Sequence, residues 1–285
     1  MATLREVKKR IRSAQNIQQI TKAMKMVAAA KLRKAQERIL AARPYSDKII
    51  EVINELIADA EGEHYPLLKK NTGVKKEAVI VLSADKGLCG SFNTNISKEV
   101  MHMFRENPDI CVYYIGKKVM DLLRKFGKGA EKFKFNDKHI DWEDIDEIGK
   151  SVAEKYEAEE ISKVTLVYSM FQSNLQQKIV KRQLLPVVFE EKTEEKTARD
   201  FIYEPAEEAL LNNLLSRYIK TTLYRAVLES QASEHGVRMV AMEMATINAG
   251  EMIGDLTLLA NKTRQAAITN EILEIVGGAE AIKGK

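Results

Sequence analysis

The chain has 285 residues, 30% of them charged, and a net charge of +4 at pH 7. This length allows one or two domains with a hydrophobic core. Two cysteines exclude a disulfide framework, and no apolar run approaches the roughly 20 residues of a membrane helix. The N-terminus also lacks a signal-peptide core, so we expect no direct membrane span.

Residues 1–58 are predicted to form one long helix. Thr3 and Glu6 fit a capping box, which satisfies two free backbone donors at a helix start. Apolar residues follow in steps of three and four, the spacing of one helix face. This stripe comprises Leu4, Val7, Ile11, Ala14, Ile17, Ile20, Met24, Val27, Ala28, Leu32, Ala35, Ile39 and Ala42. Pro44 is expected to end or kink the helix.

The same segment is strongly basic. Residues 1–43 contain twelve Lys or Arg and two Glu, a net charge of +10. Such a segment expects an acidic partner: nucleic acid, anionic lipid or an acidic protein surface. It has no interleaved aromatic residues for base stacking and fits no named DNA-binding motif. An acidic protein partner explains the charge equally well.

The middle of the chain, residues 75–200, alternates between strand and helix patterns, which predicts a mostly parallel, Rossmann-like α/β domain. The last two strands, joined by a short turn at Ser173-Asn174, predict an antiparallel hairpin at one edge. The expected strands are 79–82, 110–115, 163–171 and 176–185, and the expected helices are 94–104, 119–126 and 143–157.

The stretch SADKGLCGSFN, residues 83–93, follows the first strand and has the outline of a phosphate-binding loop. A P-loop, however, needs Gly-x4-Gly-Lys-Ser/Thr, and a dinucleotide site needs Gly-x-Gly-x-x-Gly. Gly87 and Gly90 are three apart, and no Lys precedes Ser91. A structural turn or a surface for a partner is therefore favoured over a nucleotide site.

No catalytic or metal-binding set is apparent, so we expect a protein that is not an enzyme and holds no cofactor. Cys89 would need a nearby base to act as a nucleophile, but the four histidines are scattered. A buried or partner-facing thiol is the favoured interpretation. The acidic run Asp141, Glu143, Asp144, Asp146 and Glu147 is interpreted as a solvated helix start rather than a metal site.

Residues 206–285 are predicted to form a second long helix, beginning after Pro205. A coiled-coil seam is expected at Leu256, Leu259, Thr263, Ala266, Asn270 and Leu273, and a stop at Gly277-Gly278. Gly236, Gly250 and Gly254 within the pattern indicate either local tolerance or close helix approach. Residues 206–276 alone would form a helix about 105 Å long, which exceeds the diameter of about 50 Å of a compact globule of 285 residues. The two terminal helices should therefore pair as an antiparallel coiled coil.

The C-terminal tail contains no Lys or Arg from Ala266 to Ile282, and its apolar residues cover nearly every face. A helix that is apolar all round is buried somewhere. Because its own domain cannot cover the end of so long a helix, the tail predicts a sleeve supplied by another protein.

Three segments together resemble a known family. They are QNIQQITKAMKMVAAAKLRKAQ (15–36), SADKGLCGSFNTNI (83–96), and ASEHGVRMVAMEMATINAGEMI running on to NKTRQAAITNEILEIVGGAEAI (232–282). The chain is similar to gamma subunits of F-type ATP synthase, the central rotor shaft. That resemblance implies a coiled coil inside a ring of alpha and beta subunits. It also implies an α/β domain that contacts the epsilon subunit and the membrane rotor ring, with nucleotide chemistry left to beta.

The resemblance also implies which residues contact the catalytic ring. Arg264 and Gln265 would meet a loop of a catalytic subunit, and the loop at Asp85 and Lys86 would face the ring. The other implied contacts are Arg238, Met24, Lys22, Lys25, Lys31 and Arg33, the basic ones facing acidic loops of beta. No paired-cysteine insert or transit peptide is visible, which favours a bacterial chain at the cytoplasmic face of the cell membrane, bound peripherally. An α/β enzyme with a helical appendage and a coiled-coil nucleic-acid binder remain the alternatives.

Overall fold

The computed structural model describes residues 3–57, 65–124, 131–132, 142–173, 177–188 and 207–283. Its elements are α1 (Leu4–Ile57), β1 (Glu77–Leu82), α2 (Phe92–Glu106), β2 (Cys111–Ile115), α3 (Lys118–Leu123), β3 (Glu131–Lys132), α4 (Trp142–Glu157), β4 (Lys163–Phe171), β5 (Gln177–Leu185) and α5 (Glu207–Lys283). They form two compact units. The paired-helix unit comprises Met1–Ala28 and Met239–Lys285, and the sheet unit comprises Ala29–Arg238.

The sheet unit is built on five strands in the order β3-β2-β1-β4-β5. The strands pair in parallel except β4 and β5, which are antiparallel. The predicted mostly parallel sheet with an antiparallel edge hairpin is thus confirmed. Strand β3 was not predicted, because a strand of two residues is too short to show an alternation of apolar and polar side chains.

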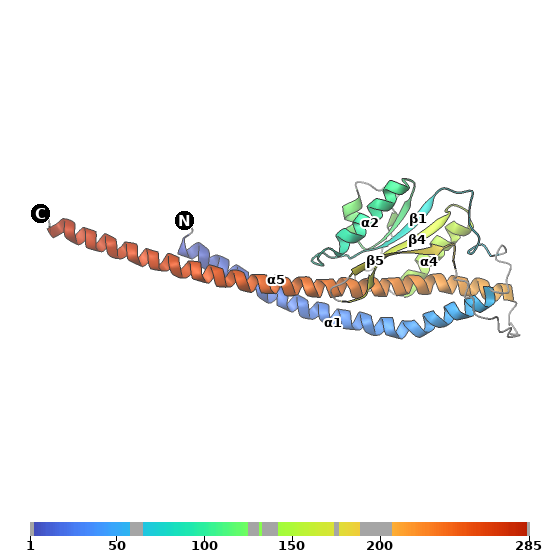
Figure 1. Ribbon diagram of the computed structural model, residues 1–285, viewed down its shortest axis with the longest axis horizontal. Coiled ribbons are helices and arrows are strands. Elements are labelled where there is room, and N and C mark those ends of the chain that lie inside the picture. The colour runs from blue at the N-terminus through green and yellow to red at the C-terminus, as the bar shows by residue number, and fades with distance from the viewer. Residues whose placement is uncertain are drawn as a thin grey trace. The chain divides into compact units, whose positions relative to one another are not determined.

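Helices cover both faces of this sheet, which explains why β1 is an unbroken apolar run. Ala78, Ile80 and Leu82 face a core shared with α1, α4 and α5. Val79 and Val81 face a second core shared with α2 and α3. In Figure 1, α2 lies on the opposite side of the sheet from α5. The sheet unit is therefore a three-layer α/β structure.

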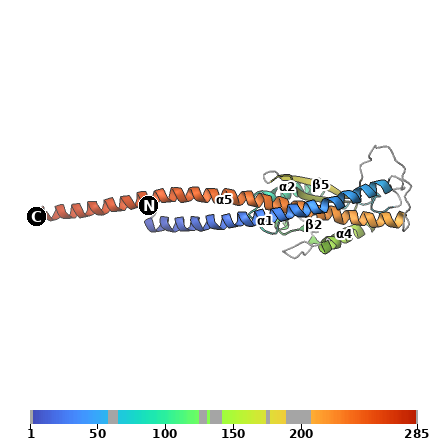
Figure 2. The ribbon, with the colours of Figure 1, turned by 90° about the horizontal axis from the view of Figure 1, so that it is seen from below.

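The paired-helix unit is antiparallel. Its cross-helix contacts join Lys25 to Glu243, Thr21 to Thr246, and Gln18 to Gly250, so α1 numbers fall as α5 numbers rise. The two helices lie side by side in this unit in both views (Figure 1, Figure 2). The predicted antiparallel coiled coil is therefore present here.

The helix ends show one confirmed prediction and one wrong one. The capping box forms: the Thr3 N–H donates to Glu6 Oε2 over 3.0 Å, and the Glu6 N–H donates to Thr3 Oγ1 over 3.4 Å. Pro44 was expected to end or kink the first helix; it does not end α1, which continues to Ile57, and the kink stays a prediction. Gly277-Gly278 does not stop α5, which continues to Lys283. Glycine weakens a helix by about 1 kcal/mol relative to Ala but does not forbid it.

The seam of the paired-helix unit differs from the predicted one. Ile17, Ile20 and Val27 are exposed although the stripe included them, and Leu259 is exposed where a seam residue was expected. The residues at least partly buried in heptad steps are Val7, Ile11, Ala14, Gln18, Thr21, Lys25 and Ala28 on α1, and Met242, Thr246, Ala249, Ile253, Leu256, Ala260 and Thr263 on α5. Small and polar residues, rather than the larger aliphatic ones, therefore form much of the contact.

Several predictions lie outside the described residues. These are the limits at residues 58, 126, 176, 200 and 206, the turn residue Asn174, Pro205 and Asp141. The domain boundaries inferred from sequence therefore stay predictions.

Candidate functional site: partner-facing surfaces

The loop at residues 83–93 is firmly tied to the sheet unit. The Ser83 N–H donates to the Ile115 carbonyl over 2.7 Å, and the Ala84 N–H donates to Asn93 Oδ1 over 3.0 Å. Asp85 Oδ1 accepts from the Lys117 N–H over 3.1 Å. These bonds anchor both ends of the loop, while the Asp85 and Lys86 residues themselves remain exposed.

The middle of the loop adopts left-handed backbone conformations. Gly90 has φ +53° and Leu88 has φ +61°. A Cβ on Gly90 would lie 3.3 Å from Val237 Cγ1 of α5, so glycine permits both the conformation and the close approach. Leu88 lacks the conformational freedom of glycine and is 63% exposed. A large side chain at positive φ is uncommon and costs free energy, which the surrounding contacts must offset.

Arg238 on α5 meets the same loop. Its Nη2 donates to the carbonyls of Lys86 and Gly87, over 3.3 Å in each case. Its Nη1 donates to Glu234 Oε1 over 2.6 Å. The Arg238 side chain is only 11% exposed, so most of it is committed inside the sheet unit.

This arrangement answers whether the loop cradles a nucleotide. In open α/β sheets, ligands bind beyond the carboxyl ends of the strands where the strand order reverses, which here is between β1 and β4. Helix α5 runs beside both positions, because Ser233 is hydrogen-bonded to Ser169 of β4 over 2.7 Å and Val237 approaches Gly90. The chain's own helix therefore packs against both elements that flank the position where such ligands bind.

Cys89 is a buried thiol, as predicted. The Asn93 side-chain amide donates to its sulfur over 3.2 Å. Burial raises the pKa of Cys89 above its usual value, and the nearby Arg238 offsets only part of this effect. A raised pKa keeps the sulfur protonated, which is the opposite of what a nucleophilic cysteine needs.

The acidic run on α4 makes ion pairs. Asp146 contacts both Lys150, over 2.7 Å, and Lys220 of α5. Its hydrogen bonds to these two lysines lower the pKa of Asp146. Within the described parts of the chain, no group of three or more acidic, histidine or cysteine side chains could hold a metal ion.

The basic residues implied as ring contacts fall on both units. In the paired-helix unit, Lys22 is exposed and Lys25 is paired with Glu243 over 2.6 Å. Met24 is half-buried beside them. In the sheet unit, Lys31 is exposed and Arg33 is paired with Glu37 over 3.1 Å. All four basic side chains are at least partly exposed to solvent.

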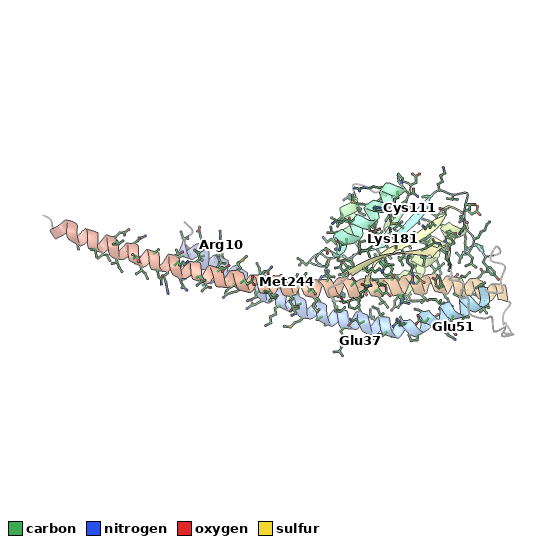
Figure 3. The ribbon with its side chains drawn as sticks, in the orientation of Figure 1. Arg10, Glu37, Glu51, Cys111, Lys181 and Met244 are labelled. Atoms are coloured by element: carbon green, nitrogen blue, oxygen red, sulfur yellow. The ribbon has the colours of Figure 1, made fainter. Side chains whose placement is uncertain are left out.

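A third surface is the C-terminal part of α5. Every described side chain from 264 to 279 is exposed, including those of Arg264 and Gln265. Five large aliphatic residues in this stretch are about half exposed or more: Ile268, Ile272, Leu273, Ile275 and Val276. Met244, labelled in Figure 3, and Ile247 add exposed apolar surface nearer the middle of α5. Monomeric proteins rarely expose contiguous apolar surface on this scale, so it marks an interaction site.

The sequence reasoning missed the Glu234–Arg238 pair and the Ser169–Ser233 contact. The Glu-to-Arg spacing of four was a readable signal for the first. No sequence pattern indicates the second, because its residues are 64 positions apart.

Among the helices that the structure describes, none combines the length and the apolar character that a membrane span requires.

Comparison with known proteins settles the family. The sequence profile of the ATP-synt family, described as ATP synthase, matches residues 3–282. The chain is 45% identical to the ATP synthase gamma chain of Geobacter metallireducens over the full length of both. It is 44% identical to that of Heliobacterium modesticaldum, over 99% of this chain and all of the relative. This chain belongs to the ATP synthase gamma chain family.

Solved structures agree. The central stalk and c-ring structure from Tetrahymena thermophila mitochondrial ATP synthase contains a chain 28% identical to this one, with a TM-score of 0.58, covering 79% of this chain and 99% of that one. An Euglena gracilis mitochondrial ATP synthase structure contains a chain 21% identical, with a TM-score of 0.70, covering 98% and 94%; this second likeness shows the fold. As a gamma chain, the protein is the non-catalytic central-stalk subunit of ATP synthase rather than an enzyme with its own active site.

Proposed function

We propose that the exposed C-terminal part of α5 turns inside a sleeve formed by alpha and beta subunits, with Arg264 and Gln265 meeting a loop of a catalytic subunit. The observation that carries this proposal is the exposure of every described side chain from 264 to 279, among them five large aliphatic residues. Such a surface is stable only when another protein covers it.

The basic residues supply a second kind of contact, with acidic loops of beta. Lys22, Lys25 and Met24 offer it from the paired-helix unit, and Lys31 and Arg33 from the sheet unit. The existing partners of Lys25 and Arg33 do not prevent this, because exposed ion pairs contribute about 0–1 kcal/mol and exchange readily. Asp85 and Lys86 extend the contact through the exposed loop.

Coupling follows from these contacts. A shaft without threefold symmetry presents a different face to each catalytic subunit, so rotation driven by proton flow favours a different state of each site in turn. A shaft shifts such equilibria only as far as its interaction energy differs between the states. The α/β domain would meet the epsilon subunit and the membrane rotor ring, at the cytoplasmic face of a bacterial membrane. The basic N-terminal segment, which also suited a nucleic-acid binder, is explained by acidic loops of beta.

The test is charge reversal at the C-terminal surface in a reconstituted complex. Arg264→Glu should lower ATP turnover at least about tenfold, as loss of a desolvated charged contact does, while circular dichroism shows an unchanged fold. Lys98→Glu on the exposed face of α2 is the matched control and should leave turnover unchanged. Normal turnover of the Arg264→Glu complex would refute the assigned contact.

A further inference from the structure

The guanidinium of Arg238 has four N–H bonds on its terminal nitrogens, and the structure provides an acceptor for each. Nη2 bonds the Lys86 and Gly87 carbonyls, and Nη1 bonds Glu234 Oε1 and His235 Nδ1, the last over 3.3 Å. Arg238 thus commits its four terminal N–H groups inside its own chain, which leaves at most the Nε–H for a partner.

The two carbonyls that Arg238 binds belong to the residues immediately before Leu88, whose backbone is left-handed. A strained backbone of this kind persists only where its surroundings hold it. On the loop's other side, Gly90 rests against Val237, the residue next to Arg238. The ends of this part of the loop are bonded within the sheet unit, Asp85 to the Lys117 N–H and Cys89 to Asn93, whereas Arg238 of α5 holds the carbonyls of Lys86 and Gly87 between them.

We infer that Arg238 is a positioning residue, which fixes the loop of residues 83–93 against α5 so that Asp85, Lys86 and Leu88 reach the catalytic ring in a single conformation. The consequence for the catalytic ring rests on the proposed function, whereas the positioning of the loop is a property of the isolated chain. It also gives Arg238 a different role from a direct ring contact.

Glu234 and His235 orient the guanidinium. Both precede Arg238 on the same helix, at the spacings of four and three that bring side chains together. Burial, reinforced by the charges of Arg238 and Lys31, lowers the pKa of His235 to about 4. A neutral imidazole keeps a lone pair on Nδ1, which can accept the Arg238 hydrogen. A lysine could not replace this arrangement, since its ammonium has only three donors and no planar fork.

The two cysteines report on the loop directly. Cys89 lies within it and is 2% exposed, whereas Cys111 lies in β2 and is 7% exposed. Alkylation of the full-length chain, followed by mass spectrometry of the two cysteine peptides, separates release of the loop from opening of the whole sheet unit.

Arg238→Gln should speed alkylation of Cys89 about tenfold or more, the factor expected when bonds from a charged group are lost, while Cys111 keeps its wild-type rate. Loss of the Arg238 charge alone would raise the pKa of Cys89 and slow its alkylation, so a faster rate reports release of the loop. The Cys89 alkylation rate of Arg238→Lys should fall between those of the wild type and Arg238→Gln. Arg225→Lys, the same replacement on the same helix at an ion pair with Glu229, is the matched control and should change neither rate. An unchanged Cys89 rate in Arg238→Gln would overturn the inference, as would an equal rise at both cysteines.

Turnover of the reconstituted complex separates this inference from the proposed function. Lowered turnover in Arg238→Gln with an unchanged Cys89 rate would make Arg238 a direct contact and overturn its positioning role. Faster Cys89 labelling in Arg238→Gln would uphold the positioning role. If turnover were then normal in an Asp85→Ala, Lys86→Ala variant, the proposed contact of the loop with the ring would be refuted while the positioning role stood.

Discussion

The hydroxyl of Thr246 on α5 is hydrogen-bonded to the hydroxyl of Thr21 on α1, with 2.8 Å between the oxygens. This polar contact lies between the Lys25–Glu243 pair and the close approach of Gln18 to Gly250. Because small and polar residues take the seam here, Ile17, Ile20 and Ile247 stay on the outside. The helices thus keep apolar surface for a partner.

Removing the bond between these hydroxyls should cost little beyond the bond itself. Each hydroxyl also bonds a carbonyl of its own helix, Thr21 that of Gln18 and Thr246 that of Met242. Thr21→Val should therefore lower the free energy of unfolding by at most about 1 kcal/mol. The double variant Thr21→Val, Thr246→Val should cost about as much as the single one, because the cross-helix bond is already lost in the single variant. Denaturant unfolding followed by circular dichroism measures both. Thr257→Val is the control, since its exposed hydroxyl bonds the Ile253 carbonyl of its own helix.

Two glycines of α5 should respond differently to alanine. A Cβ on Gly254 meets nothing within 4 Å, so Gly254→Ala should stabilise the protein by up to about 1 kcal/mol through helix propensity. A Cβ on Gly250 would lie 3.0 Å from Gln18 Nε2, and moving that side chain should cancel most of the gain. Thermal unfolding compares the two. Equal stabilisation would show that α1 does not approach α5 closely at Gly250.

Gly116, just after β2, should tolerate no side chain. Its φ is +97°, and a Cβ there would clash with the backbone carbonyl of Ser83, which cannot swing away as a side-chain tip can. Gly116→Ala should lower the free energy of unfolding by about 3 kcal/mol or more, the range for backbone strain combined with overpacking. The matched control is Gly87→Ala, whose Cβ meets nothing within 4 Å. Similar unfolding midpoints for the two variants would contradict this account.

His235 should make the protein less stable in acid. The unfolded chain protonates this histidine near pH 6.5, whereas the folded chain holds its pKa at about 4. Between these values the unfolded state binds more protons than the folded state. The free energy of unfolding therefore falls by up to about 3 kcal/mol as the pH falls from 7 to 4, and this contribution levels off below pH 4.

Comparison with His235→Gln isolates this contribution. Burial raises the pKa of the neighbouring Glu234, an effect of opposite sign that both proteins share. The difference in unfolding free energy between the two proteins should therefore change in favour of His235→Gln on acidification. A difference independent of pH between 7 and 4 would show that His235 is not held neutral.

The accuracy of the sequence reading depended on how local each signal was. The strand near residues 79–82 and the hairpin of β4 and β5 were found because their apolar runs and turn are local. The capping box at Thr3 and Glu6 was readable for the same reason. The seam was misread at Ile17 and Ile20, because steps of three and four describe two overlapping faces of one helix. Only the opposing residues, Thr246 and Gly250, select the face that packs.

The sequence by itself determined that two long helices flank an α/β domain without a catalytic set, and that the C-terminal tail needs a partner to cover it. Periodicity, strand–helix alternation and the spacing of phosphate-binding motifs are properties of neighbouring residues. Tertiary structure decided the rest: that Arg238 is bonded to a loop about 150 positions earlier, and that α5 packs against both β4 and the loop after β1. Such contacts join distant segments, and their energies depend on distances that no local pattern encodes.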